Sequence, residues 1–181
     1  MSARGTAGGG FADVAAASGH ITTVSVSTIA DPQTAFVVFT AGMGEWWQRG
    51  NPLTGRYLRE VCVDPFVGGR LHGKDADGEQ ICWGVVLAWE PGEQFVFDCL
   101  ADAGPNASTT QTRTGTVSVR FTGTGAGITL VEVVHQRLAD KRSGLLRRTA
   151  AGANGGWTDG LAAYTAAADR AVQSGAGAPS P

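Results

Sequence analysis

The chain has 181 residues, of which 43% are hydrophobic and 17% are charged, and its formal net charge at pH 7 is −2. This length suits one domain around a single core, in which folding removes roughly 70% of the unfolded chain's surface from water. The charge provides no basic field for nucleic-acid phosphates, and no stretch approaches the roughly 18 continuous apolar residues of a membrane span, so we expect neither a nucleic-acid partner nor a membrane segment.

Both ends of the chain are rich in Gly, Ala and Ser and show no sustained hydrophobic period, over residues 1–18 and 174–181. Such segments bury too little apolar surface to offset the entropy lost on ordering, so we predict flexible tails there. The N-terminal residues also lack the basic start and apolar centre of a secretion signal. We therefore expect one domain over residues 19–173.

The domain is predicted to begin with a strand and a short helix. Residues 21–29 alternate valine with serine, and this period of two predicts a half-buried strand. Asp31 then stands where a helix N-cap belongs, with Pro32 at the first helical position and two phenylalanines three residues apart after it. This pattern predicts a short helix that begins at Asp31, followed by a second turn or short helix that carries Trp46 and Trp47.

From Tyr57 onward the hydrophobic period of two returns. Glycine-containing pairs and runs separate the alternating segments and supply the positive φ angles that tight connections require. The predicted strands are 57–63, 70–74, 80–89, 94–99, 114–121 and 128–137. This spacing favours a meander of neighbouring antiparallel strands.

The last predicted element is a long helix from about 154 to 172. Its apolar residues are spaced by four, three, four and four positions, which places them on one face: Trp157, Leu161, Tyr164, Ala168 and Val172. Only the sheet offers an apolar layer for this face, so the helix is predicted to pack across it. We therefore predict an α+β fold in which a curved antiparallel sheet and the helix enclose an apolar hollow.

The three cysteines are Cys62, Cys82 and Cys99, an odd number set about 20 residues apart on predicted strands. No CxxC motif and no paired histidines accompany them, which argues against a disulfide framework and against a zinc site. We predict a reducing, cytoplasmic compartment, no metal and no cofactor.

Five local strings follow these elements in order: GEWWQRG, DPFVGGR, WGVVLAWEP, VEVVHQ and GGWTDGLAAY. Together they resemble the branch of the START and Bet v 1-like superfamily, also called SRPBCC, that is related to the activator of Hsp90 ATPase. The resemblance covers roughly residues 20 to 172. It implies a helix-grip fold, in which a seven-stranded antiparallel sheet wraps around a long C-terminal helix and two short helices follow the first strand.

The resemblance implies a pocket without naming a reaction, because the superfamily includes lipid and polyketide binders, cyclases and dehydratases, co-chaperone domains and bacterial proteins without an assigned role. We predict that the chain binds a small hydrophobic or aromatic molecule between the sheet and the helix. One alternative is an enzyme of the polyketide cyclase or dehydratase type that uses the same pocket. Another is a co-chaperone-like interaction module, and an exposed edge strand leaves a homodimer possible.

Four residues illustrate the alternatives at the predicted site. Trp46 and Trp47 match the paired tryptophans that the family places beside its cavity entrance, although either ring could simply fill the core. Trp83 lies on a strand with apolar residues at both parities, so alternation does not assign its inward side. His135 shares parity with the more apolar set of its strand, which predicts an inward imidazole that binds a ligand, transfers a proton or is a satisfied core group.

Arg113 has the parity of the apolar residues on its strand, so it is expected either at the rim of the hollow or as a solvated charge. No residue is assigned a catalytic role, because the sequence contains no catalytic or nucleotide-binding signature. The candidate ligand-binding residues are Phe39, Trp46, Trp47, Trp83, Phe97, Arg113, His135 and Trp157.

Overall fold

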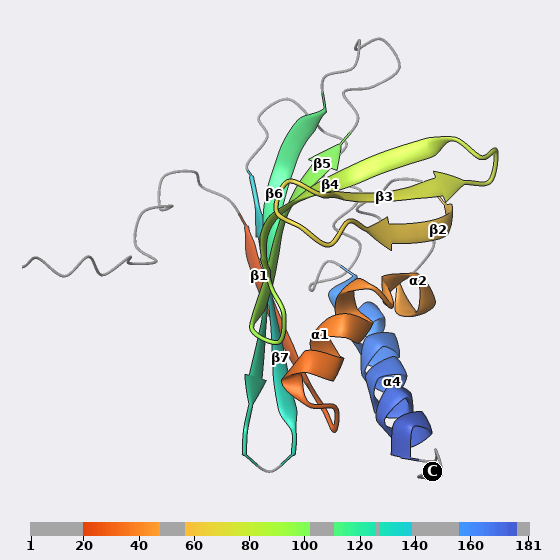
Figure 1. The fold of residues 1–181 in the computed structure, drawn as a ribbon. Coiled ribbons are helices and arrows are strands. Elements are labelled where there is room, and N and C mark those ends of the chain that lie inside the picture. Colours follow the sequence, from red (N-terminus) through yellow and green to blue (C-terminus); the bar gives the residue numbers. More distant parts are fainter. Residues whose placement is uncertain (1–19, 48–56, 102–110, 126, 139–155, 177–181) are drawn as a thin grey trace, which may run out of the picture.

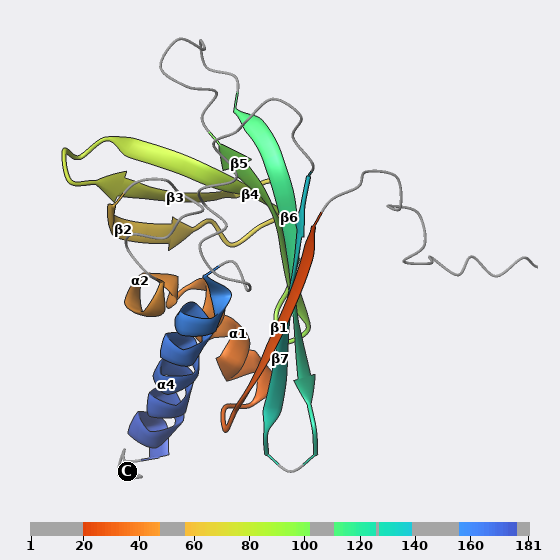
Figure 2. The same ribbon diagram turned by 180° about the vertical axis from the view of Figure 1, so that it is seen from behind.

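A computed structural model describes residues 20–47, 57–101, 111–125, 127–138 and 156–176. Figures 1 and 2 show a strongly curled sheet with helices gathered on its concave side. The elements in chain order are β1 (Ile21–Thr28), α1 (Pro32–Thr40), α2 (Met43–Trp46), β2 (Leu58–Val63), β3 (Arg70–Asp75), β4 (Gln80–Glu90), β5 (Gln94–Ala101), β6 (Thr112–Gly123), β7 (Thr129–Arg137) and α4 (Trp157–Ala176).

The strands form one antiparallel sheet in the order β1-β7-β6-β5-β4-β3-β2. From β2 to β7 each strand pairs with the next in sequence, whereas β1 pairs with β7 at the other end of the meander. Because the sheet curls, β2, β3 and β4 run across the direction of β1, β6 and β7 in Figure 1. This curl creates the concave face on which α1, α2 and α4 lie.

Helix α1 begins as its sequence predicts. Asp31 is the N-cap residue, and its carboxylate accepts hydrogen bonds from the backbone N–H groups of Gln33 and Thr34, while Pro32 is the first helical residue. The Thr34 hydroxyl also donates to this carboxylate at 2.6 Å. These bonds, led by that hydroxyl, hold the pKa of Asp31 below its ordinary value.

Helix α4 is fixed to the sheet and to α1 by side-chain hydrogen bonds. One carboxylate oxygen of Asp169 accepts from the Thr28 hydroxyl at 2.6 Å and from the Ile29 backbone N–H at 3.0 Å, just after β1 ends. The Tyr164 hydroxyl donates to the Ala35 carbonyl in α1 at 2.9 Å. Since the Thr28 and Tyr164 bonds pair buried or half-buried polar groups, they set the position of α4 as well as contributing to stability.

Strand β4 presents apolar residues at both parities because its phase changes along its length. Its pairing shifts once opposite β3 and once opposite β5, where each extra residue forms a bulge. Ile81 is buried before the first shift, Trp83 is the buried extra residue at that shift, and Val86 is buried after it. Trp89, beyond the second shift, packs its ring against Phe36. The residues of β4 that face the core are therefore odd-numbered at first, then even-numbered, then odd-numbered again.

The predicted α+β helix-grip fold is confirmed, and each predicted strand forms with ends within two residues of its predicted bounds. The bounds of the long helix require a correction. Gly156, with a φ of +79°, precedes the helix start at Trp157, and residues 154 and 155 lie outside the described part. The helix also continues to Ala176, into the predicted tail 174–181, because no helix-breaking proline occurs before Pro179. The predicted tail 1–18 falls outside the described residues.

Candidate functional site

Six elements direct side chains into the space between the concave sheet and α4. Seven of the eight candidate residues lie in this space, and each is at most 4% exposed: Phe39 from α1, Trp46 from α2, Trp47 at the α2 C-cap, Trp83 from β4, Phe97 from β5, His135 from β7 and Trp157 from α4. Residues that are distant in the sequence thus form one buried, mainly aromatic cluster.

Trp47 and Trp83 lie at the centre of one half of this cluster. Their rings are nearly parallel, with centroids 4.9 Å apart and an interplanar angle of 24°. Trp157 makes a T-shaped contact with Trp47, with ring centroids 5.8 Å apart, and Phe97 makes one with Trp83 at 6.0 Å. In this region the predicted hollow is therefore occupied by the protein's own rings, because four large aromatic side chains span the gap between sheet and helix.

Phe39 and Trp46 form the other half of the cluster and join the three helices. Their ring centroids are 4.8 Å apart, and Trp46 also contacts Tyr164 of α4 at 5.4 Å. The Trp46 indole N–H donates to the Val38 carbonyl at 3.0 Å. Because its polar group is already bonded, Trp46 acts here mainly as an apolar wall.

His135 faces inward, as its parity predicts, and is only 2% exposed. Its Nδ1 accepts a hydrogen bond from the Trp157 indole N–H at 3.3 Å, which places the proton of the neutral ring on Nε2. Burial, with the nearby positive charge of Arg137 as the smaller cause, lowers the pKa of His135 to about 4. At neutral pH the imidazole is therefore uncharged, and its Nδ1 lone pair is in use.

The indole N–H groups of the cluster differ in their partners. Those of Trp46 and Trp157 donate to Val38 and His135. The N–H groups of Trp47 and Trp83 are buried and meet no hydrogen-bond acceptor in the described part of the chain. A buried donor without a partner is unusual in a folded protein, because it loses its bond to water and gains none in return. Both of these unpaired donors belong to the stacked rings of Trp47 and Trp83.

Arg113 lies apart from the cluster. Its Nε donates to the Asp98 carboxylate at 2.8 Å, and one guanidinium N–H donates to the Thr116 hydroxyl at 2.7 Å. Both partners lie on the face of the sheet that points away from the helices, where residues are less buried. Of the two alternatives expected for Arg113, the structure has the solvated charge and not the rim of the hollow, because the β5–β6 pairing shifts between Cys99 and Leu100 and reverses the parity at Arg113.

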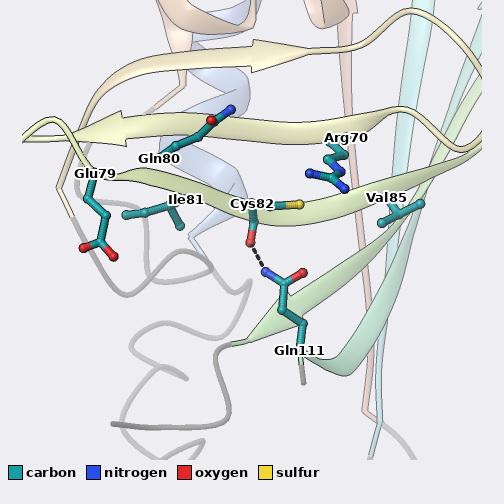
Figure 3. Close-up of a pocket in the computed structure, with 7 residues that line it drawn as sticks. All are labelled: Arg70, Glu79, Gln80, Ile81, Cys82, Val85 and Gln111. Atoms are coloured by element: carbon teal, nitrogen blue, oxygen red, sulfur yellow. Dashed lines mark hydrogen bonds between the residues drawn. The ribbon is translucent and has the colours of Figure 1, made fainter. Parts of the chain in front are cut away.

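An open pocket of about 410 Å³ lies on the outer side of β3 and β4 (Figure 3). None of the candidate residues lines it. The Gln111 side chain crosses one side and donates to the Cys82 carbonyl at 2.6 Å. Its lining residues are Arg70, Glu79, Gln80, Ile81, Cys82, Val85 and Gln111. A mainly polar, open pocket of this kind removes little apolar ligand surface from water, so it fits a hydrophobic molecule less well than the buried cluster.

No group of three or more His, Cys, Asp or Glu side chains in the described residues is arranged to hold a metal ion. The three cysteines are free, and Cys62 is exposed whereas Cys99 is buried. Burial, assisted by the negative charge of Asp98, raises the pKa of the Cys99 thiol to about 12. Cys99 is consequently protonated at neutral pH and is an apolar core residue of β5.

Several solved structures have a fold similar to that of this chain. The crystal structure of protein MLL2253 from Mesorhizobium loti superposes with a TM-score of 0.60 at 20% identity, covering 83% of this chain and 98% of that one. The solution structure of CalC from Micromonospora echinospora, described as a self-sacrificing resistance protein, gives 0.55 at 24%, covering 83% and 95%. The anthrahydroquino-gamma-pyrone synthase Txn09 gives 0.50 at 24%, covering 81% and 96%.

This chain has the helix-grip fold. At these identities the likeness concerns the fold alone, and the curled sheet fits the START and Bet v 1-like superfamily that the five sequence strings resemble. No family model and no curated protein matches the chain. Among its described helices, none is long and apolar enough to cross a membrane.

Proposed function

We propose that this helix-grip protein binds a small, mostly apolar, aromatic molecule between the curved sheet and α4. The observation that supports this most strongly is the convergence of aromatic side chains from separate helices and strands on one enclosed region, with His135 and indole N–H groups as its polar points. Apolar walls with a few fixed polar groups are the usual composition of a small-molecule site.

The expected affinity follows from the area that a ligand would bury. About 300 Å² of apolar ligand surface at roughly 25 cal/mol per Å² gives a gross gain on the order of 7 kcal/mol. Lost translational and rotational freedom and the displacement of protein side chains reduce this gain, which leaves roughly micromolar binding at best unless polar contacts add to it.

The descriptions of two fold neighbours are compatible with such a role. Txn09 is described as a synthase and CalC as a resistance protein. We further place this chain in the branch related to the activator of Hsp90 ATPase, and in the cytoplasm, on its sequence motifs and cysteines alone. A co-chaperone role rests on the same sequence motifs. A pull-down with this protein that recovers no chaperone would argue against it.

Binding is favoured over catalysis because of the state of His135. A general base near neutral pH needs a free lone pair and a pKa close to the working pH. The Nδ1 atom of His135 already accepts the Trp157 N–H, and the pKa of the ring is lowered to about 4. The imidazole is therefore suited to orient Trp157 or to donate from Nε2, and poorly suited to remove a proton.

The proposal is tested by screening lipids and aromatic compounds for a rise in the melting temperature, together with native mass spectrometry of the purified protein. A ligand at one hundred times its Kd stabilises the native state by about 2.7 kcal/mol, which corresponds to roughly 5 to 10 °C for a domain of this size. The Trp83→Leu variant should lose this shift, and Trp89→Phe, outside the cluster, should retain it. No shift with any compound and no co-purified molecule would refute the proposal.

A further inference from the structure

The contact between Trp47 and Trp83 has a geometry that a planar molecule can reproduce. Among the ring pairs formed by described residues, this is the near-parallel stack, at 4.9 Å and 24°. The other ring contacts of this pair are edge-to-face: Trp47 with Trp46 and with Trp157, and Trp83 with Phe97. A flat group that replaced the Trp47 ring would stack on the face of Trp83 and lie at a steep angle to the Trp157 ring, as Trp47 does.

The Trp47 ring is held by packing and ring contacts, since its indole N–H makes no hydrogen bond to a described residue. It is the C-cap residue of α2, a helix of only four residues. Trp83 lies within β4, which pairs with β3 on one side and β5 on the other. Trp157 is held by its hydrogen bond to His135. A change of the Trp47 rotamer therefore breaks no side-chain hydrogen bond to a described residue, whereas turning Trp157 breaks its bond to His135. The backbone of Trp83, unlike that of Trp47, is fixed between two paired strands.

The unsatisfied indole N–H groups also favour replacement of the Trp47 ring by a bound molecule. Both the Trp47 and the Trp83 indole N–H groups are buried without an acceptor. If the Trp47 ring turns out toward water, its N–H gains a water partner and is no longer an unsatisfied buried donor. The Trp83 N–H stays buried, so only an acceptor carried by the incoming molecule satisfies it.

We propose that Trp47 is a displaceable plug over Trp83, and that the ligand replaces its indole with a flat bicyclic aromatic group whose edge carries a neutral hydrogen-bond acceptor for Trp83 Nε1. The inference rests on the proposed function and specifies its ligand. The bicyclic size follows from the indole that it replaces. The acceptor is a carbonyl-type oxygen without charge, because one indole N–H cannot compensate the burial of a carboxylate.

Three naphthalenes that share the ring system and differ in the group at position 2 test the acceptor: 2-acetylnaphthalene, 2-ethylnaphthalene and 2-naphthoate. We expect the ketone to bind about tenfold more tightly than the ethyl compound, the effect of one added hydrogen bond to an unsatisfied donor. In proton–nitrogen NMR spectra the ketone should move the Trp83 indole signal downfield, and the ethyl compound should not. The difference between the two compounds is the readout, because both naphthalene rings change the ring-current shifts of the indoles that contact Trp47, including those of Trp46 and Trp157, in the same way.

Two variants separate the plug from the acceptor contact. Trp47→Ala removes the plug, so both neutral naphthalenes should bind at least tenfold more tightly and the preference for the ketone should remain. If this variant does not fold, Trp47→Leu serves the same purpose. Trp83→Phe keeps an aromatic face but lacks the N–H, and should lose the preference. Trp89→Phe, which contacts Phe36 and Phe95 outside this region, is the control for loss of ring volume and should behave as wild type.

The outcomes distinguish the inference from the proposed function. Equal binding of the ketone and the ethyl compound, or tightest binding of 2-naphthoate, would overturn the acceptor assignment and leave hydrophobic binding intact. Wild-type affinity in the Trp47 variants would overturn the plug. Failure of all three compounds to bind the wild type and both Trp47 variants would overturn the inference, and the broader compound screen would then decide the proposed function separately.

Discussion

The stability of this protein should fall in mildly acidic solution because of one buried histidine. Burial lowers the pKa of His135 to about 4, whereas its ordinary value is 6.5. A lowered histidine pKa means that the unfolded state binds a proton more readily than the native state. The full stability is therefore present above pH 6.5 and is lost as the pH falls toward 4. At 1.36 kcal/mol per pKa unit, the loss amounts to about 3 kcal/mol.

The His135→Gln variant isolates this contribution, since its amide oxygen can accept the Trp157 indole N–H but does not titrate. Urea unfolding of both proteins should be measured between pH 4 and pH 7.5. The free energy of unfolding of the wild type minus that of the variant should fall by about 3 kcal/mol from pH 7.5 to pH 4. The titration of carboxylates is common to both proteins and cancels in this difference. Parallel pH profiles, or an NMR titration of the His135 ring with a midpoint near 6.5, would refute the burial argument.

Three further predictions concern the positions of α4 and β5. Asp169→Ala should lower the free energy of unfolding by about 1 to 3 kcal/mol in urea, since it leaves the Thr28 hydroxyl without its acceptor; an unchanged value would mean that water replaces the carboxylate. Tyr164→Phe should cost about 1 kcal/mol in the same measurement, and no loss would show that its hydroxyl bond makes no net contribution. Cys62 should react with a thiol reagent in the native protein, and Cys99 only after unfolding; equal rates would contradict the burial of Cys99.

Strand positions were predictable from the sequence because each strand has one apolar and one polar face over most of its length. The period of two is a direct consequence of the alternating side-chain directions, so it identifies a strand without knowledge of its neighbours. Strand β4 shows the limit of this argument. Its bulges are set by its pairing with β3 and β5, which is a tertiary property, and the inward side of Trp83 could not be assigned without them.

Arg113 illustrates the same limit at the candidate site. Its number has the parity of the buried residues of β6, but its guanidinium bonds to Asp98 and Thr116 on the outer face. Parity holds only while register is continuous, and the β5–β6 register shifts beside Arg113. His135 was placed correctly by the same rule because its pairing with β1 and β6 is continuous around it. A parity argument is thus reliable in proportion to the regularity of the neighbouring strands.

The stack of Trp47 on Trp83 changes the affinity expected from the fold. An open hollow would give a ligand the full gain from its buried surface, on the order of 7 kcal/mol for about 300 Å². A filled cluster requires that Trp47 first leave the apolar interior, which costs about 1.5 to 3 kcal/mol of burial and about 0.5 to 1.5 kcal/mol of ring contact. Relief of its unsatisfied N–H offsets part of this cost. The wild-type protein should therefore bind simple hydrocarbons weakly and discriminate by the Trp83 hydrogen bond, so that selectivity comes from the plug and the donor together.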